Sequence, residues 1–151
     1  MSELIIKSSV TINAPVVKVW DALVNPQETK KYMFGCETVS DWKEGSELIW
    51  RGEYEGKPMD FVQGYIKTLQ PEKFLAYTVI DPNNKSIPNI PENYLTVTYE
   101  LISEGNTTVL NVTQGDYSKV AEGERRYKEA DNNGLGWSPI LELIKKQVEG
   151  N

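Results

Sequence analysis

The chain has 151 residues, of which 39% are hydrophobic and 25% charged, so its composition excludes an intrinsically disordered protein and fits one domain over residues 1–151. Its net charge of −6 at pH 7 disfavours nucleic acid and anionic membrane surfaces as partners, because both attract basic proteins. The longest apolar runs, such as residues 4–6, are too short to cross a bilayer, and we expect no membrane contact.

The first part of the chain predicts one strand and two short helices. Apolar residues of even number recur through residues 3–12, which is typical of a strand with one buried face. Pro15 suits a first helical turn, and the spacing of the apolar residues that follow predicts a helix over 15–24. Pro26 ends that helix, because the residue before a proline avoids the α region. A second short helix is expected over 26–32.

Alternating segments in the middle of the chain predict strands separated by turn residues. The expected strands cover residues 36–40, 46–55, 58–69, 74–80, 94–102 and 107–114. Gly56-Lys57 is expected to form a hairpin turn between two of them. Residues 82–93 contain three prolines and four asparagines, a composition typical of a loop.

The C-terminal region predicts a long helix. Four apolar residues line one helical stripe there: Ile140, Leu141, Ile144 and Val148. Residues 119–131 are expected to form the first part of the same helix, which Gly134, Gly136 and Pro139 should bend or interrupt. The order of strand, two helices, further strands and long helix indicates an α+β fold, with an antiparallel sheet and the helices on one side.

Three segments resemble, in their order and spacing, the activator of Hsp90 ATPase homologue 1-like branch of the Bet v 1/START-like (SRPBCC) superfamily. They are residues 12–15 with 19–23, residues 64–66 with Leu69, Pro71, Leu75 and Tyr77, and residues 136–137 with Leu141 and 143–145. The resemblance implies a helix-grip fold, in which a curved antiparallel sheet of about six to seven strands wraps around the C-terminal helix and leaves a hydrophobic cavity. Members carry lipids, bind plant or polyketide-like molecules, cyclise polyketides or assist a chaperone, so the fold leaves the activity open.

The aromatic residues are the main candidates for a binding site. A two-residue turn at Gly56-Lys57 would align the strands on either side so that their aromatic residues share one face, toward the C-terminal helix. These residues either line a ligand pocket or pack as a solid core, and Gln63 on the same face favours a pocket, because a buried amide needs a partner. The predicted ligand-binding residues are Trp50, Tyr54, Phe61, Gln63, Tyr65, Tyr77, Tyr99, Trp137 and Leu141.

The amino-acid composition gives little support for a catalytic site. The chain has no histidine and one cysteine, Cys36, which excludes Ser-His-Asp triads, Cys-His pairs and imidazole metal sites, and we expect neither a metal nor a cofactor. Glu53 is expected to face Asp60 beside Arg51, an arrangement that can raise a carboxyl pKa but is more often a solvated rim. The lone thiol and the absence of a secretory pattern in the first residues favour the cytoplasm.

Three functions compete on these grounds. The favoured one is a carrier, sensor or stress-response protein that binds a small hydrophobic or aromatic ligand in the cavity. The second is a chaperone-associated interaction domain, for which a chaperone contact or a homodimer contact stays open. The third is a polyketide cyclase-like enzyme, which would need an ionisable group with a shifted pKa inside the cavity.

Overall fold

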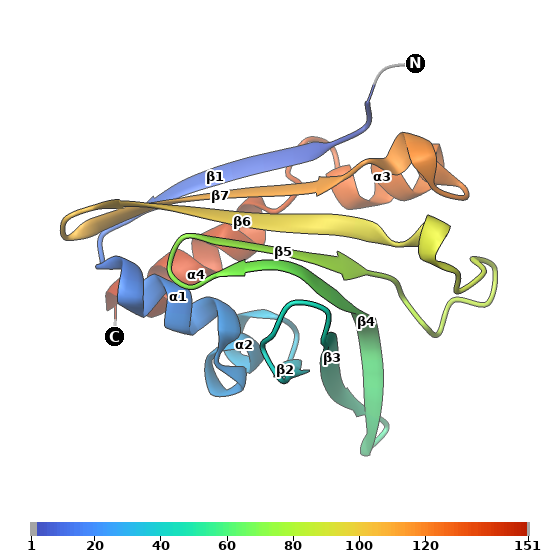
Figure 1. Ribbon diagram of the computed structural model, residues 1–151, viewed down its shortest axis with the longest axis horizontal. Coiled ribbons are helices and arrows are strands. Elements are labelled where there is room, and N and C mark those ends of the chain that lie inside the picture. Colours follow the sequence, from blue (N-terminus) through green and yellow to red (C-terminus); the bar gives the residue numbers. More distant parts are fainter. Residues whose placement is uncertain (1–2, 151) are drawn as a thin grey trace.

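The computed structural model describes residues 3–150, which form a seven-stranded antiparallel sheet and four α-helices (Figure 1). The strands are β1 (Ile6–Ile12), β2 (Glu37–Ser40), β3 (Glu47–Tyr54), β4 (Lys57–Gln70), β5 (Phe74–Val79), β6 (Leu95–Glu104) and β7 (Thr107–Gly115), in the sheet order β1-β7-β6-β5-β4-β3-β2. The helices are α1 (Val16–Val24), α2 (Pro26–Tyr32), α3 (Gly123–Asp131) and α4 (Ser138–Gly150). The α+β helix-grip prediction is confirmed. Within the described residues, no helix is long and apolar enough to cross a membrane.

The curvature of the sheet comes largely from β4. This strand has 14 residues and pairs with β3 along its first part and with β5 along its last part. Its register against β3 shifts between Trp50 and Arg51, and its register against β5 shifts between Ile66 and Thr68. Such irregularities bend a strand and increase its twist. β4 therefore turns away from β5 and carries β3 and β2 around toward α2 (Figure 1).

The helices cover one face of the sheet, which we call the inner face. Along β6 the inner side chains are those buried in alternation: Leu95, Val97, Tyr99 and Leu101. On α4 the predicted stripe is buried at Leu141, Ile144 and Val148, and Ile140 packs against it while partly exposed. Side chains of β6 and α4 belong to one hydrophobic cluster, which is the main core.

The C-terminal helix is interrupted, as the sequence predicts. Residues 132–137 separate α3 from α4, and positive φ angles occur at Asn132, Asn133, Gly134 and Gly136. Gly136 lies against β1, where a Cβ would come within 2.9 Å of Ile6 Cγ2. The backbone N–H of Trp137 then donates to Ser8 Oγ at 3.2 Å. These contacts fix Trp137 against the inner face of the sheet.

The β3–β4 hairpin differs from its prediction. The turn is formed by Glu55 and Gly56, both at positive φ, one residue earlier than expected. Two left-handed central residues are typical of a type I′ turn, which glycine favours. With the bulge after Trp50, this turn pairs Trp50 with Val62 instead of Gln63. The predicted alignment of β3 with β4 was therefore wrong.

Candidate ligand-binding site

A cavity lies against the inner face of the sheet, between β3–β7, the loop after α2 and the residue that precedes α4. Its volume is about 390 Å³, and small-molecule sites span about 300–1,000 Å³. The residues that line it are Met33, Phe34, Cys36, Trp50, Phe61, Val62, Tyr77, Val79, Val97, Gln114 and Trp137. Most of these side chains are apolar, and no Asp, Glu, Lys or Arg is among them. The cavity is therefore suited to an apolar or aromatic ligand.

Four aromatic rings form a continuous wall beside the cavity, from β3 to the segment before α4. The ring centroids of Trp50 and Tyr77 are 6.3 Å apart, and those of Tyr77 and Tyr99 are 5.4 Å apart. Tyr99 in turn meets Trp137 edge to face, with centroids 5.9 Å apart. Edge-to-face contacts of this kind stabilise the relative orientation of the rings. The wall is thus held in place by its own packing.

Two polar groups interrupt the apolar lining. Gln114 accepts a hydrogen bond from Trp137 Nε1 at 2.7 Å through Oε1, and its Nε2 donates to the Tyr117 hydroxyl at 2.9 Å. The second group is the pair of hydroxyls of Tyr77 and Tyr99, 2.7 Å apart and buried. A buried polar group that is already hydrogen-bonded adds rigidity to a site and costs little to enclose.

The ionisable side chains of the lining are both held neutral. Burial raises the pKa of the Tyr77 hydroxyl well above its ordinary value, and the neighbouring Tyr99 raises it further. Burial likewise raises the pKa of the Cys36 thiol, so this group is protonated near neutral pH. The cavity therefore presents an uncharged surface under physiological conditions.

Phe34 stands at the edge of the cavity and is 85% exposed. It lies in the loop between α2 and β2, with a φ of 53°, and Gly35 after it has a φ of 82°. The backbone N–H of Cys36 donates to the carbonyl of Met33 at 2.8 Å, which closes this turn. The turn holds a large apolar side chain at the cavity rim, where it faces water.

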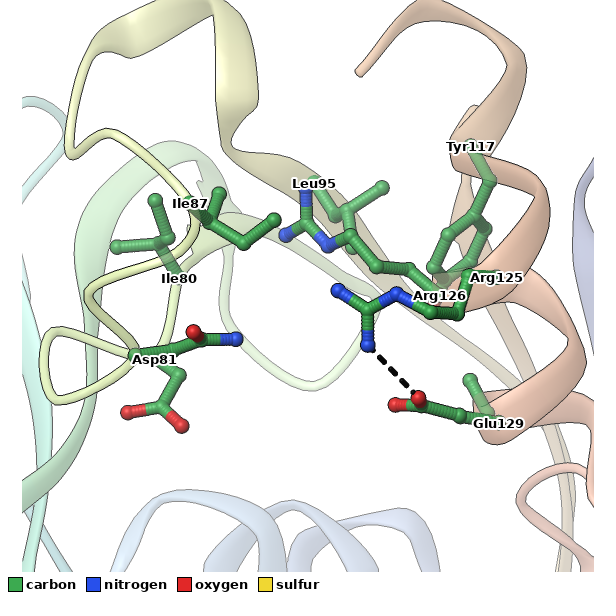
Figure 2. A pocket seen from close by; sticks show the side chains of 10 residues that line it. Ile80, Asp81, Ile87, Leu95, Tyr117, Arg125, Arg126 and Glu129 are labelled. Carbon is green, nitrogen blue, oxygen red and sulfur yellow. Dashed lines mark hydrogen bonds and ion pairs between the residues drawn. The ribbon is translucent and has the colours of Figure 1, made fainter. Parts of the chain in front are cut away.

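A second hollow of about 350 Å³ lies beside α3, where β5 and β7 end and β6 begins. It is lined by Ile80, Asp81, Asn84, Ile87, Leu95, Tyr117, Arg125, Arg126, Glu129 and Ala130. Figure 2 shows that the arginines come from α3 and that Asp81 and Ile87 form the opposite wall. Arg125 is neutralised by Glu122 at 2.8 Å and by Glu129 at 2.9 Å. Leu95 and Ile87 are buried, so this hollow combines charged groups with apolar ones.

Comparison with known families and structures fits this geometry. The sequence model of the family described as Activator of Hsp90 ATPase homolog 1-like protein matches residues 13–149. The chain belongs to this family. Comparison with curated proteins finds no match.

Solved structures agree with the family assignment. ChR145 from Cytophaga hutchinsonii is 38% identical over 98% of this chain and 96% of its own, with a TM-score of 0.75. CalU16 from Micromonospora echinospora is 21% identical over 97% and 74%, with a TM-score of 0.69. The Aha1 protein from Colwellia psychrerythraea, solved as a dimer, is 17% identical over 97% and 96%, with a TM-score of 0.68. The last two show the fold alone. The Bet v 1/START-like resemblance is confirmed.

In this Hsp90 ATPase activator homologue-like domain, the predicted ligand-binding residues divide into three groups. Those that line the cavity are Trp50, Phe61, Tyr77 and Trp137. Tyr99 and Leu141 are buried behind the lining, where Tyr99 supports two of the aromatic rings. Tyr54, Gln63 and Tyr65 do not line the cavity, and Tyr54 and Tyr65 are 58% and 48% exposed. The predicted placement of these three side chains was wrong.

Gln63 and Tyr65 face outward because of the bulge in the β3–β4 pairing. The extra residue, Phe61, reverses which of the following side chains of β4 share the face of Trp50, so Val62 points inward and Gln63 and Tyr65 do not. On the outer face Gln63 Nε2 donates to the Tyr94 hydroxyl at 3.1 Å. The rings of Tyr65 and Tyr94 lie 6.5 Å apart. The amide of Gln63 thus has its partner outside the cavity.

The acid–base cluster on β3 and β4 is also arranged differently from its prediction. Glu53 lies opposite Pro58, and Asp60 lies opposite Arg51, whose Nε is 2.7 Å from Asp60 Oδ1. Both members of this ion pair are about two-fifths exposed, so water screens their attraction. This pair therefore belongs to the solvated rim of the hairpin.

The remaining lining residues were not predicted from the sequence: Met33, Phe34, Cys36, Val62, Val79, Val97 and Gln114. Alternation along β6 and β7 contained a signal for two of them, because Val97 shares parity with Tyr99, and Gln114 shares parity with Leu110. No local pattern marks the loop after α2, since Phe34 reaches the cavity only through the fold.

Proposed function

We propose that this domain binds a small apolar or aromatic molecule in the cavity between the sheet and Trp137, and serves as a carrier or sensor of that molecule. The observation that carries the proposal is the cavity itself, about 390 Å³ of space bordered by mostly apolar side chains. Transfer of an apolar molecule from water into such a space is favoured by about 25 cal/mol per Å² of apolar surface buried. The aromatic wall further favours a ligand with a flat face.

The Tyr77–Tyr99 hydroxyl pair supports a ligand that also carries one oxygen acceptor. Each hydroxyl has one hydrogen, and the contact between the two oxygens uses only one of them. Within the described part of the chain, this contact is the only hydrogen bond of either hydroxyl. Tyr77 lines the cavity, so a ligand carbonyl or ether oxygen near it would take up the remaining hydrogen.

Two experiments test whether the cavity binds a ligand. Native mass spectrometry of the purified protein, followed by organic extraction, should reveal a co-purified small molecule. Titration with the neutral fluorescent probe N-phenyl-1-naphthylamine should give saturable binding at one site per chain. An empty extract together with no probe binding would contradict the proposal and would favour an interaction role such as a chaperone contact.

Replacing Phe61 by alanine is expected to weaken binding of this probe about tenfold. Phe61 lines the cavity and is only partly buried, so its removal deletes ligand contact without emptying the core. The loss of an aromatic contact worth about 1.5–3 kcal/mol corresponds to a tenfold or larger effect. Fluorescence titration of both proteins measures it.

Tyr65→Ala is the matched control, because Tyr65 is an aromatic residue of the same strand that faces outward. We expect probe affinity to be unchanged in this variant. An equal loss in both variants, or a larger loss in Tyr65→Ala, would show that the probe does not occupy the inner cavity.

A further inference from the structure

Arg126 is a partly buried cation that forms no ion pair within 4 Å among residues 3–150, although Glu122 attracts its charge from further away. Its NH1 donates to the carbonyl of Ala121 at 3.3 Å, and its NH2 donates to the carbonyl of Asn93 at 3.2 Å. A guanidinium has five N–H donors, so three remain. Burial lowers the pKa of Arg126, which reflects the cost of enclosing its charge. An anion placed beside it would offset that cost.

Four charged side chains line this hollow, and their formal charges balance: Asp81, Arg125, Arg126 and Glu129. Arg126 is the guanidinium among them that forms no ion pair with the described residues. Arg125, the adjacent residue of α3, is already paired with Glu122 and Glu129. Asp81 lies on the opposite wall, and no ion pair joins it to either arginine (Figure 2). The N–H fork of Arg126 matches a carboxylate through two parallel hydrogen bonds, and Asp81 on the far wall does not occupy it.

The position of Arg126 is fixed by a buried frame. Asn93 is 6% exposed, and its Nδ2 donates to the carbonyl of Pro88 at 3.0 Å. Its Oδ1 accepts the backbone N–H of Ala121 at 3.0 Å. Both carbonyls that hold Arg126 therefore belong to segments tied together by one side chain. A guanidinium held in this way loses little conformational entropy when it binds an anion.

The hollow that contains Arg126 adjoins the apolar cavity. Val97 lines the cavity and Leu95 lines the hollow, and these side chains share the inner face of β6 two residues apart, about 7 Å along the strand. Gln114 of the cavity is hydrogen-bonded to Tyr117 of the hollow. Leu95, Tyr117, Val79 and Trp137 also belong to one hydrophobic cluster. The two spaces therefore share a wall one side chain thick.

We propose that the ligand is an amphipathic monocarboxylic acid, whose apolar body occupies the cavity and whose carboxylate binds Arg126 in the adjoining hollow. This inference rests on the proposed function, since it names the chemical class of ligand for the same site. To reach Arg126, the chain of the ligand would displace packed side chains of the shared wall beside Val79 and the Gln114–Tyr117 pair. The uncharged, mostly apolar lining of the cavity suits the hydrocarbon part of the ligand, and the guanidinium of Arg126 suits its carboxylate.

The test compares decanoate with 1-decanol as competitors of N-phenyl-1-naphthylamine. The two have the same number of carbon atoms and differ in the charge of the head group. In the unmodified protein we expect decanoate to compete at least as well as decanol. In Arg126→Gln we expect decanoate affinity to fall about tenfold or more, as for loss of a charge-assisted hydrogen bond, while decanol affinity is unchanged.

Two further variants make the result specific. Arg125→Gln removes the neighbouring guanidinium, which is already neutralised, and should leave decanoate affinity unchanged. Arg126→Lys keeps the positive charge without the planar fork, and should retain part of the affinity for decanoate. Because the lysine keeps a cation at this position, it also serves if the glutamine variant fails to fold.

The outcomes separate this inference from the proposed function. Loss of decanoate affinity alone in Arg126→Gln supports the carboxylate site. Equal loss for decanoate and decanol would mean that Arg126 only ties α3 to the loop before β6, and would overturn the inference. The inference would also be overturned if decanoate and decanol displaced the probe equally well from the unmodified protein and from Arg126→Gln. That result would leave the proposed function intact. Failure of the probe itself to bind would overturn both.

Discussion

Replacing Val97 by phenylalanine is expected to abolish binding of N-phenyl-1-naphthylamine without lowering the free energy of unfolding. Val97 is 1% exposed and lies on β6, where it lines the cavity. The additional atoms of phenylalanine would extend into empty space, where they gain contacts instead of displacing neighbours. Fluorescence titration measures the loss of binding, and urea denaturation measures the stability.

Val112→Phe is the matched control for this substitution. Val112 is also 1% exposed and belongs to the same core cluster, on the neighbouring strand β7, but it does not line the cavity. Overpacking at such a position typically costs about 1–3 kcal/mol. If Val97→Phe destabilised the protein as much as Val112→Phe, the space beside Val97 would be filled by side chains in solution, and the ligand-binding proposal would fail.

The order of the elements could be read from the sequence because each signal is local. The alternation along residues 94–102 follows from the pleat of a strand whose one face is buried, and β6 shows that alternation from Leu95 to Leu101. Pro15 and Pro26 correctly indicated the ends of α1, and Gly134 and Gly136 correctly indicated the break before α4. These features depend on residues within one or two turns of each other.

The pairing of β3 with β4 could not be read in the same way. It depends on where the turn begins, which changes the partners, and on one bulge, which moves the side chains beyond it to the other face of the sheet. Trp50 kept its inward direction, because its own strand alternates as expected. Tyr65, fifteen residues further along the chain, lies beyond the bulge and points outward. One bulge therefore reverses the predicted faces of all the β4 residues that pair beyond it.

The Arg126 hollow shows a second limit of sequence reading. Its walls come from the loop after β5, the start of β6, the segment after β7 and α3, which are joined only by the fold. The sequence of α3 contains alternating charges, a pattern typical of a solvated helix surface. Arg126 differs from Arg125 in two respects that only the structure shows: it donates to two backbone carbonyls, and it forms no ion pair within the described residues.

Replacing Gly64 by alanine is expected to have the largest effect on folding. Gly64 is buried in β4, where a Cβ would lie 1.6 Å from the carbonyl oxygen of Thr78 on β5. Backbone cannot move aside as a flexible side chain can, so β4 and β5 would have to separate. At the same place the N–H of Tyr65 donates to Thr78 Oγ1 at 2.9 Å, and that hydrogen bond would be lost as well. We expect a loss of about 4 kcal/mol or more, close to the whole stability of many domains.

Gly150→Ala tests whether this loss comes from the crowding between β4 and β5. At Gly150, near the end of α4, the same Cβ would meet no described atom within 4 Å, and alanine favours a helix over glycine. Circular dichroism during urea denaturation should therefore give an unchanged or slightly higher midpoint for Gly150→Ala and little folded protein for Gly64→Ala. Native-like stability of Gly64→Ala would contradict the close approach of the two strands, and with it the bend of β4 that opens the cavity between sheet and helices.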